Sequence, residues 1–187
     1  AEFDRYRAEK QPHPLMIEHG IQAIPFAHPE LDEWRMNFKG IQILHEPTNF
    51  IVTGAVDDLW MNSEGELIVV DYKATSTTRE ITLDEEYRQA YKNQMEIYQW
   101  LLRQKGFMVS DTGYFVYCNG DASKDRFDGK LEFSTSVIPY IGNDSWVEET
   151  LFKARACLEA DVFPEAGKDC AFCNYRAAVR KHLKDLE

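Results

Sequence analysis

The sequence predicts an α/β fold in which a mixed central sheet is flanked by helices. Two runs rich in Val, Ile, Leu, Trp and Tyr meet at a polar turn within residues 54–73, which is typical of a β-hairpin. Residues 83–106 carry an apolar stripe of helical period. Two more apolar strand-like runs, 111–120 and 130–142, precede an acidic helix start at residue 144. Strands and helices that follow one another in this way predict helices packed on a sheet.

Length and charge restrict the classes of protein that fit. The chain has 187 residues, so we expect a single domain over residues 1–187, with residues 161–187 as a cysteine-containing tail. The 21 basic and 32 acidic residues give a net charge of −11, which argues against indiscriminate binding to duplex nucleic acid. No apolar run approaches the roughly 20 residues of a bilayer span, and no apolar leader opens the chain. We therefore expect a cytoplasmic protein without a membrane partner.

Short elements are predicted ahead of the hairpin. Residues 1–10 begin without Met and resemble the end of a helix, so we expect a truncated N-terminus. Residues 11–26 contain three prolines and predict an extended segment. Residues 29–35 predict a helix start, because Pro lies in the first turn and acids complement the helix dipole. Residues 40–46 predict a strand beside the hairpin.

The alternation of side chains along the hairpin predicts where its acids lie. Strands over residues 51–61 and 66–74 are joined by the turn 62–65. When the pairing is centred on that turn, Asp57 lies directly across from Asp71. Opposed residues of this kind have Cβ atoms only about 4.5–5.5 Å apart, so two carboxylates there repel each other unless a cation compensates them.

A lysine joins this pair of carboxylates. Asp71 and Lys73 share one face of their strand, whereas Val70 and Tyr72 point to the other face. Carboxylate oxygens are the ligands that Mg²⁺ and Mn²⁺ prefer. We expect Lys73 to be exposed, without an obligatory fold contact, where an ammonium can orient a water and offset charge on a phosphate. Hydrolysis of a phosphodiester needs these parts.

A simpler alternative stays open for the hairpin. In that interpretation Asp57, Asp58 and Asp71 are solvated carboxylates and Lys73 is a surface lysine.

The predicted helix over residues 83–106 brings a polar pair toward the hairpin. Gln94 and Tyr98 are four residues apart and therefore lie on one helix face, and Gly106 supplies the stop signal. Core packing of Tyr98 and a partly buried amide at Gln94 are the structural alternative to a functional role. The stripe that packs on the sheet consists of Tyr87, Tyr91, Met95, Tyr98 and Leu102.

Three motifs follow one another in this region, and their order and spacing resemble the PD-(D/E)XK nuclease superfamily, particularly its RecB-type exonuclease branch. The resemblance implies a restriction-endonuclease-like core and a DNA substrate. It also implies Asp57 and Asp71 as ligands of Mg²⁺ or Mn²⁺, Lys73 as the catalytic lysine, and Gln94 and Tyr98 as residues that support the site or touch nucleic acid. The motifs are Gly54-Ala55-Val56-Asp57, Asp71-Tyr72-Lys73 and Gln94-Met95-Glu96-Ile97-Tyr98.

The family's first motif, an acid or histidine on a helix before the hairpin, has no G-x-x-x-H counterpart here. The possible substitutes have no specific support and are better explained as ordinary surface residues. They are Glu2, Asp4, His19, His28 and Glu30.

Cys170 and Cys173 form a C-x-x-C pair ahead of a basic helix. The pair resembles the cysteine module that follows the nuclease core in some relatives, where it holds zinc or an iron-sulphur cluster. Those relatives use one early and three late cysteines, a pattern that this chain does not match. Cys118, Cys157 or His182 could complete the ligand set, as could cysteines missing from the N-terminus. Free thiols in a reducing cytosol are the alternative.

Together these features predict a metal-dependent nuclease that hydrolyses phosphodiester bonds of DNA, at ends or in single strands, in repair, recombination or defence. The alternative from another class is a catalytically inactive nuclease-fold module that binds nucleic acid or serves in assembly, and a structural or regulatory protein is the third. A local basic strip could guide the strand, although solvated surface explains the same residues. These are Lys124, Arg126, Lys130, Lys153, Arg155, Arg176, Arg180 and Lys181.

Overall fold

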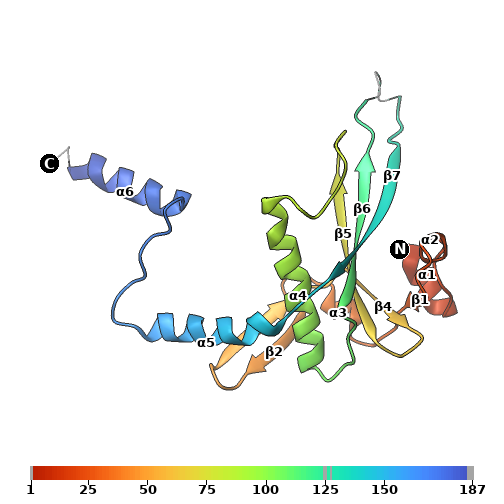
Figure 1. Ribbon diagram of the computed structural model, residues 1–187, viewed down its shortest axis with the longest axis horizontal. Coiled ribbons are helices and arrows are strands. Elements are labelled where there is room, and N and C mark those ends of the chain that lie inside the picture. Colours follow the sequence, from red (N-terminus) through yellow and green to blue (C-terminus); the bar gives the residue numbers. More distant parts are fainter. Residues whose placement is uncertain (1, 124–125, 127, 185–187) are drawn as a thin grey trace. The chain divides into compact units, whose positions relative to one another are not determined.

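A five-stranded mixed sheet with strand order β1-β4-β5-β6-β7 forms the centre of the fold (Figure 1). β5 and β6 are parallel, and the other neighbouring pairs are antiparallel. The computed structural model describes residues 2–123, 126 and 128–184. The strands are β1 (Ala23–Pro25), β4 (Asp58–Asn62), β5 (Leu67–Thr75), β6 (Thr112–Gly120) and β7 (Phe133–Ile141).

The chain divides into two compact units, Ala1–Glu149 and Thr150–Glu187. The central sheet lies entirely in the first unit. The second unit contains most of α5 (Ser145–Glu159) and all of α6 (Ala171–Lys184). A single domain over the whole chain stays a prediction.

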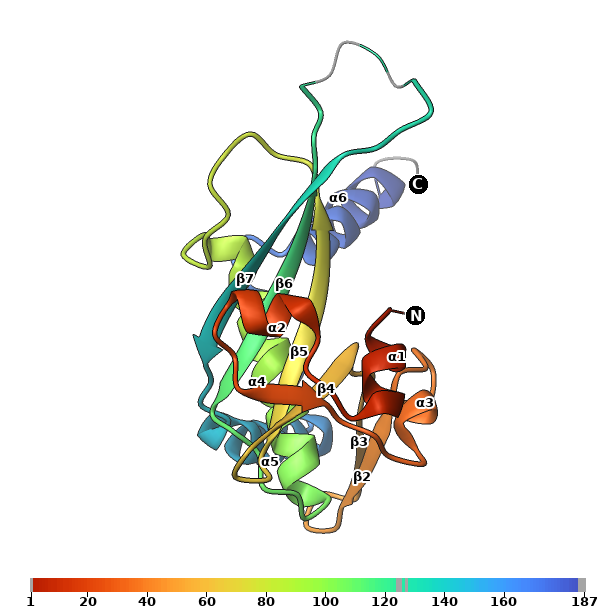
Figure 2. The same cartoon turned by 90° about the vertical axis from the view of Figure 1, so that its right-hand side faces the viewer.

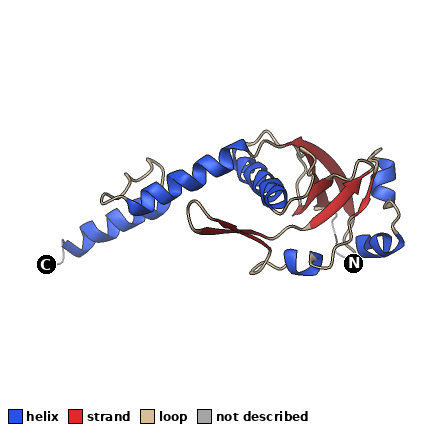
Figure 3. Cartoon of the chain, turned by 90° about the horizontal axis from the view of Figure 1, so that it is seen from below, coloured by secondary structure: helices blue, strands red, loops and turns tan. Residues whose placement is uncertain are grey.

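Helices cover both faces of the sheet, which confirms the predicted α/β architecture. α4 (Gln89–Gln104) lies on one face, and α1 (Glu2–Glu9) and α2 (Pro14–Glu18) lie on the other (Figures 1 and 3). Figure 2 views the second face, where Trp60 and Val70 are fully buried against Met16 of α2. The five residues of α2 correct the expectation of an extended segment. His13 caps this turn and Pro14 begins it, so a proline there starts a helix.

The hairpin has the predicted register, but its first strand is divided. β4 and β5 pair Trp60 with Ile68 around a turn in which Gly65 adopts a φ of 82°. The single strand expected over residues 51–61 is instead β3 (Phe50–Gly54) and β4, which belong to different sheets. The chain leaves the two-stranded sheet that contains β3 after Gly54. Two residues later, the Val56 amide donates to the Trp34 carbonyl at 3.1 Å.

The predicted strand at residues 40–46 is present as β2 (Ile41–His45), but its position corrects the prediction. It pairs with β3 in a separate two-stranded sheet and not with the β4–β5 hairpin. α4 contacts β2, β3 and β5, so this helix joins the two sheets. The helix predicted near residue 29 is the single turn α3 (Leu31–Trp34).

The long helix begins later than its apolar stripe predicts. α4 starts at Gln89 after a 3₁₀ turn over Glu86–Arg88, and the left-handed Gly106 follows its end. Met95, Tyr98 and Leu102 are buried as expected. Tyr87 is 62% exposed, which corrects its place in the buried stripe, because the 3₁₀ turn changes the angle at which it leaves the helix axis.

Glu96 is a buried acid on α4 that the hydrogen-bond geometry fully explains. Its carboxylate accepts from the Tyr140 hydroxyl and the Trp146 indole, both at 2.6 Å, and from the Asn143 amide at 3.1 Å. Glu96 therefore fastens α4 to β7 and to the start of α5.

Gly54 is the point at which β3 approaches α4 most closely. A Cβ atom there would lie 2.7 Å from the Tyr98 ring and 2.9 Å from a Leu101 methyl. We expect Gly54→Ala to lower the free energy of unfolding by about 1–3 kcal/mol, because the packed ring must move. Urea denaturation measures this change.

Gly120→Ala is the matched control. Its added Cβ would meet only ordinary contacts at 3.4 Å and beyond, so its stability should change by no more than about 0.5 kcal/mol. Equal stability of the two variants would contradict this account of Gly54.

Candidate active site

Asp71 and Lys73 form an ion pair on β5, the middle strand of the sheet. The Lys73 ammonium contacts Asp71 Oδ2, and the two side chains are 16% and 2% exposed, respectively. The structure therefore corrects the expectation of an exposed lysine without fold contacts. Solvated side chains do not describe this pair either, because a carboxylate removed from water requires such a partner.

Two groups of α4 fix the position of the lysine. Lys73 Nζ donates to Gln94 Oε1 at 3.3 Å and lies 4.5 Å from the centre of the Tyr91 ring. Gln94 Nε2 in turn donates to the Tyr98 hydroxyl at 2.6 Å. The predicted residues Asp71, Lys73, Gln94 and Tyr98 thus lie along one chain of contacts. Sequence reasoning missed the contact of Tyr91 with Lys73, although Tyr91 lies one helical turn before Gln94.

Asp57 adjoins this chain of contacts at the point where the hairpin ladder ends. The last pair of the ladder is Asp58 with Val70, so the same register places Asp57 next to Asp71. Asp57 is exposed, and its Oδ2 accepts from the Tyr72 amide at 2.8 Å. Burial raises the pKa of Asp71, the Lys73 ammonium opposes that rise, and the Asp57 carboxylate adds to it. The two acids thus repel each other at close range, as the hairpin register predicts.

Asp58 faces the other side of the sheet and takes no part in this pair. Its carboxylate is 1% exposed, accepts from the Tyr72 hydroxyl at 3.0 Å and from Arg35 at 2.7 Å, and also binds Arg7. Asp4 of α1 pairs with both arginines. This network ties α1 to the hairpin one residue away from Asp57. Alternation along the strand is the sequence signal that separates Asp58 from Asp57.

Cavities open on two sides of the site. One of about 360 Å³ is lined by Asp57, Tyr72, Arg35 and Glu2, among others. The second, of about 400 Å³, lies between β3 and α4 and includes Gln94 and Tyr98 in its lining. The first cavity thus opens at Asp57, and the second opens at the Gln94–Tyr98 pair.

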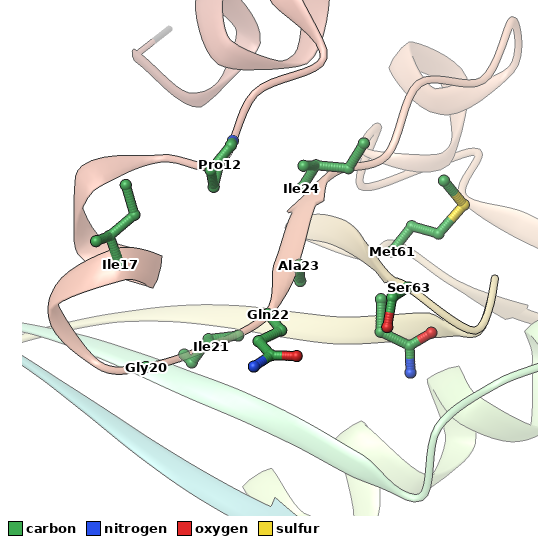
Figure 4. Close-up of a pocket in the computed structure, with 10 residues that line it drawn as sticks. Pro12, Ile17, Gly20, Ile21, Gln22, Ala23, Ile24, Met61 and Ser63 are labelled. Atoms are coloured by element: carbon green, nitrogen blue, oxygen red, sulfur yellow. The ribbon is translucent and has the colours of Figure 1, made fainter.

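A larger cavity of about 550 Å³ lies elsewhere, between α2, β1 and the β4–β5 turn (Figure 4). Its lining includes Ile17, Ile24 and Met61 and contains no titratable side chain. It shares no lining residue with the cavities at Asp57 and at Gln94.

The substitutes considered for the missing first motif are distributed unevenly. Glu2 and Asp4 line the cavity beside Asp57, but Asp4 is bound by arginines. His28 stacks on Trp34, and Glu30 lies 3.5 Å from Lys105.

The members of the basic strip are divided between the two compact units. Arg126 and Lys130 belong to the first unit, and the members from residue 153 onward belong to the second. Arg155 is bound to Glu159 at 2.6 Å. Lys124 lies outside the described residues.

The C-x-x-C pair lies at the start of α6. The Cys173 amide donates to Cys170 Sγ at 3.5 Å, and this bond lowers the pKa of the Cys170 thiol. Cys118 is on β6 in the first unit, and Cys157 is on α5. Across the described residues, no third His, Cys, Asp or Glu completes a metal-binding group with the pair.

Comparison with known proteins decides the family. The sequence model of the PD-(D/E)XK nuclease superfamily matches residues 2–178, which is most of the chain. This chain belongs to the PD-(D/E)XK nuclease superfamily. Membership confirms the predicted restriction-endonuclease-like fold. Nucleases of this superfamily are hydrolases that act on nucleic acid, and they generally use a divalent metal ion such as Mg²⁺.

Other comparisons add little to this PD-(D/E)XK assignment. No curated protein matches the chain. A crystal structure of SSO0001 is similar over 73% of this chain and 54% of that one, with 19% sequence identity and a TM-score of 0.38. The chain thus spans about half the length of that protein. No helix in the described ranges is long and apolar enough to span a membrane.

The residues of the site fit the divalent ion of PD-(D/E)XK nucleases in two respects. Asp71 Oδ2 is a buried oxygen that has the Lys73 ion pair but accepts no hydrogen bond of normal geometry from the described residues. Asp57 adds a second hard oxygen donor that is open to solvent. The same residues supply no group of three His, Cys, Asp or Glu ligands. Two carboxylates are nonetheless a common protein share of a Mg²⁺ site, because the ion keeps waters and substrate phosphate as its other ligands.

The raised pKa of Asp71 predicts a pH dependence of stability in the metal-free protein. A carboxyl whose folded pKa is raised contributes stability below its unfolded pKa of about 3.9, and that stability is lost as the pH rises through the folded value. We expect Asp71→Asn to remove this loss. As the pH rises from about 3.9 through the folded pKa of Asp71, the free energy of unfolding of the parent should therefore fall relative to that of Asp71→Asn. Urea denaturation at several pH values measures this difference.

Asp57→Asn provides the second arm of this test. Removal of its charge should lower the pKa of Asp71, because one of the causes of the rise is gone. A parent and an Asp71→Asn variant with parallel stability profiles would contradict the account.

Proposed function

We propose that this chain is a RecB-type nuclease that hydrolyses phosphodiester bonds of DNA, at ends or in single strands, in repair, recombination or defence. The observation that supports the proposal most is the buried Asp71–Lys73 ion pair with the exposed Asp57 carboxylate beside it. Burial of this ion pair costs desolvation free energy. Such an arrangement is typical of a functional site.

Asp57 and Asp71 would hold Mg²⁺ or Mn²⁺ in this proposal. The ion would supply Lewis-acid stabilisation of negative charge on the phosphate. Asp57 faces solvent, so it can meet an arriving substrate, whereas Asp71 is fixed within the middle strand.

Lys73 is the proposed catalytic residue. Contacts with Asp71, Gln94 and Tyr91 hold its ammonium in place before substrate arrives. A charge that is already positioned stabilises the developing charge of the transition state without a cost of reorganisation. The same ammonium can orient the attacking water.

Gln94 and Tyr98 are proposed as positioning residues. The amide of Gln94 gives its oxygen to Lys73 and its nitrogen to the Tyr98 hydroxyl. Burial raises the pKa of Tyr98, so the phenol stays protonated and neutral at physiological pH. The Lys73 ammonium can only donate, so Gln94 keeps one orientation, with its oxygen toward the lysine.

Replacement of Lys73 tests the proposal. We expect Lys73→Ala to lower the rate of single-stranded DNA cleavage in Mn²⁺ by about 10²–10³, judging from the loss of a comparable preorganised donor. The change should also cost about 1–3 kcal/mol of stability, because the buried Asp71 carboxylate loses its partner. Gel assays with labelled oligonucleotides and urea denaturation measure the two effects.

Lys39→Ala is the matched control, because this lysine is 55% exposed and lies 3.6 Å from Glu33 in a surface pair. It should retain the parent's rate and stability. Asp71→Asn should lose metal binding and cleavage together. If Lys73→Ala cleaves as fast as the parent at saturating Mn²⁺, the role of Lys73 is wrong. If the parent binds DNA and cleaves none with either metal, the inactive nucleic-acid-binding module replaces the nuclease.

We propose that Cys170 and Cys173 contribute to a zinc or iron-sulphur centre that is completed by residues outside this pair. Their spacing at the start of α6 suits a shared metal ion, and the lowered pKa of the Cys170 thiol favours a thiolate there, whereas the contact with Cys170 raises the pKa of Cys173. Purified protein should carry about one equivalent of zinc, or show iron-sulphur absorbance, and Cys170→Ser should lose it. Cys157→Ser tests one candidate for the remaining ligands. Metal-free protein in which both thiols alkylate rapidly would establish free cysteines instead.

A further inference from the structure

Aromatic rings continue the site beyond Lys73. The ammonium lies over the Tyr91 ring, and Tyr117 of β6 is the cross-strand partner of Lys73 in the parallel register. The Arg88 guanidinium then lies 5.6 Å from the centre of the Tyr117 ring and 5.2 Å from that of Tyr87. We name Tyr87, Tyr91 and Tyr117, together with Arg88, the aromatic platform.

Arg88 fixes the platform. Its residue is only 6% exposed, and its side chain donates to the Thr82 carbonyl and to the Tyr87 hydroxyl, the latter at 3.0 Å. It also pairs with Glu85 at 3.3 Å. The polar atoms of Arg88 are therefore used in contacts within the protein. The member of the platform that is exposed beside it is Tyr87.

Tyr87 combines exposure with a held position. The residue is 62% exposed, yet its hydroxyl accepts a hydrogen bond from Arg88 Nε and its ring packs against the Arg88 guanidinium. A ring that is already ordered loses little conformational entropy when it binds a flat partner. At the buried end of the platform, the Tyr117 hydroxyl has no hydrogen-bond partner within the described part of the chain.

The charge of the chain decides what kind of partner fits. A net charge of −11 weakens binding through phosphates, which depends on Lys and Arg. Stacking of a base on an aromatic ring does not depend on charge, and every base offers a face for it. Unpaired bases expose those faces, whereas bases within a duplex are covered by their neighbours.

We propose that the aromatic platform binds unpaired bases of a nucleic-acid strand next to the phosphate at Lys73, and so selects single-stranded over duplex substrate. This inference rests on the proposed nuclease function of the same site. Tyr87 supplies the outer stacking surface and Tyr91 the surface nearest to Lys73. The platform thereby supplies binding that an acidic protein lacks in its phosphate contacts.

Binding is tested in the Asp71→Asn background, which prevents cleavage. Fluorescence anisotropy with a labelled oligothymidylate should show that Tyr87→Ala weakens binding by about 5- to 100-fold, the range expected for loss of one stacked base. Tyr87→Phe should retain most of the affinity, because the ring remains. Phe38→Ala is the matched control, since Phe38 is a fully exposed aromatic outside the platform, and it should bind as the parent does.

An abasic oligomer of the same length separates stacking from phosphate contacts. On this probe the parent and Tyr87→Ala should bind equally, because no base is left to stack. Equal affinity of the parent and Tyr87→Ala for oligothymidylate would overturn the proposed base binding. An equal loss of affinity by Tyr87→Ala for duplex and for single-stranded DNA would overturn it as well.

Cleavage by the otherwise unaltered protein distinguishes the two levels of the proposal. If Tyr87→Ala cleaves oligothymidylate with the parent's kcat/KM while Lys73→Ala does not, base binding by the platform is wrong and the proposed nuclease activity is retained. If the parent neither binds nor cleaves nucleic acid but its Tyr87 surface captures a protein, both proposals are wrong.

Discussion

The buried ion pair between Asp71 and Lys73 is the constraint on which the rest of the site depends. A carboxylate that is 2% exposed on the middle strand of a sheet cannot stay ionised without a nearby cation. The cation is a long, flexible side chain, so it needs partners of its own, and Gln94 and Tyr91 supply them from α4. Removal of α4 from this face would leave the pair without orientation.

Gly54 allows α4 to approach closely enough to serve this purpose. Its missing side chain leaves room for the Tyr98 ring, whose hydroxyl accepts from Gln94. The same glycine ends β3, after which the chain passes to β4 in the other sheet. Asp57 therefore lies at a break between two sheets, where a side chain can be exposed although its neighbours in sequence are buried.

The two faces of the hairpin place their charges in different ways. On one face, Asp58 is surrounded by arginines and a tyrosine hydroxyl, so its carboxylate is neutralised and fully bonded. On the other face, Asp71 has only Lys73 as a cation and lies beside a second acid, Asp57. Burial and the Asp57 carboxylate raise the pKa of Asp71, and Lys73 opposes that rise. The first arrangement stabilises the fold, and the second leaves one of its two acids, Asp57, exposed to solvent.

Much of this could be derived from the sequence, because it follows from local rules. The period of two along a strand put Asp71 and Lys73 on one face, the polar turn set the register toward Asp57, and the helical period put Gln94 over Tyr98. The sequence by itself thus determined the α/β class and the superfamily, and it singled out residues that the structure brings together. Only the tertiary structure decided the burial of Lys73, the division of the first hairpin strand between two sheets, and the exposure of Tyr87. These depend on how closely α4 approaches β3 and β5, and such distances are fixed by packing between segments far apart in the chain, which no local pattern encodes.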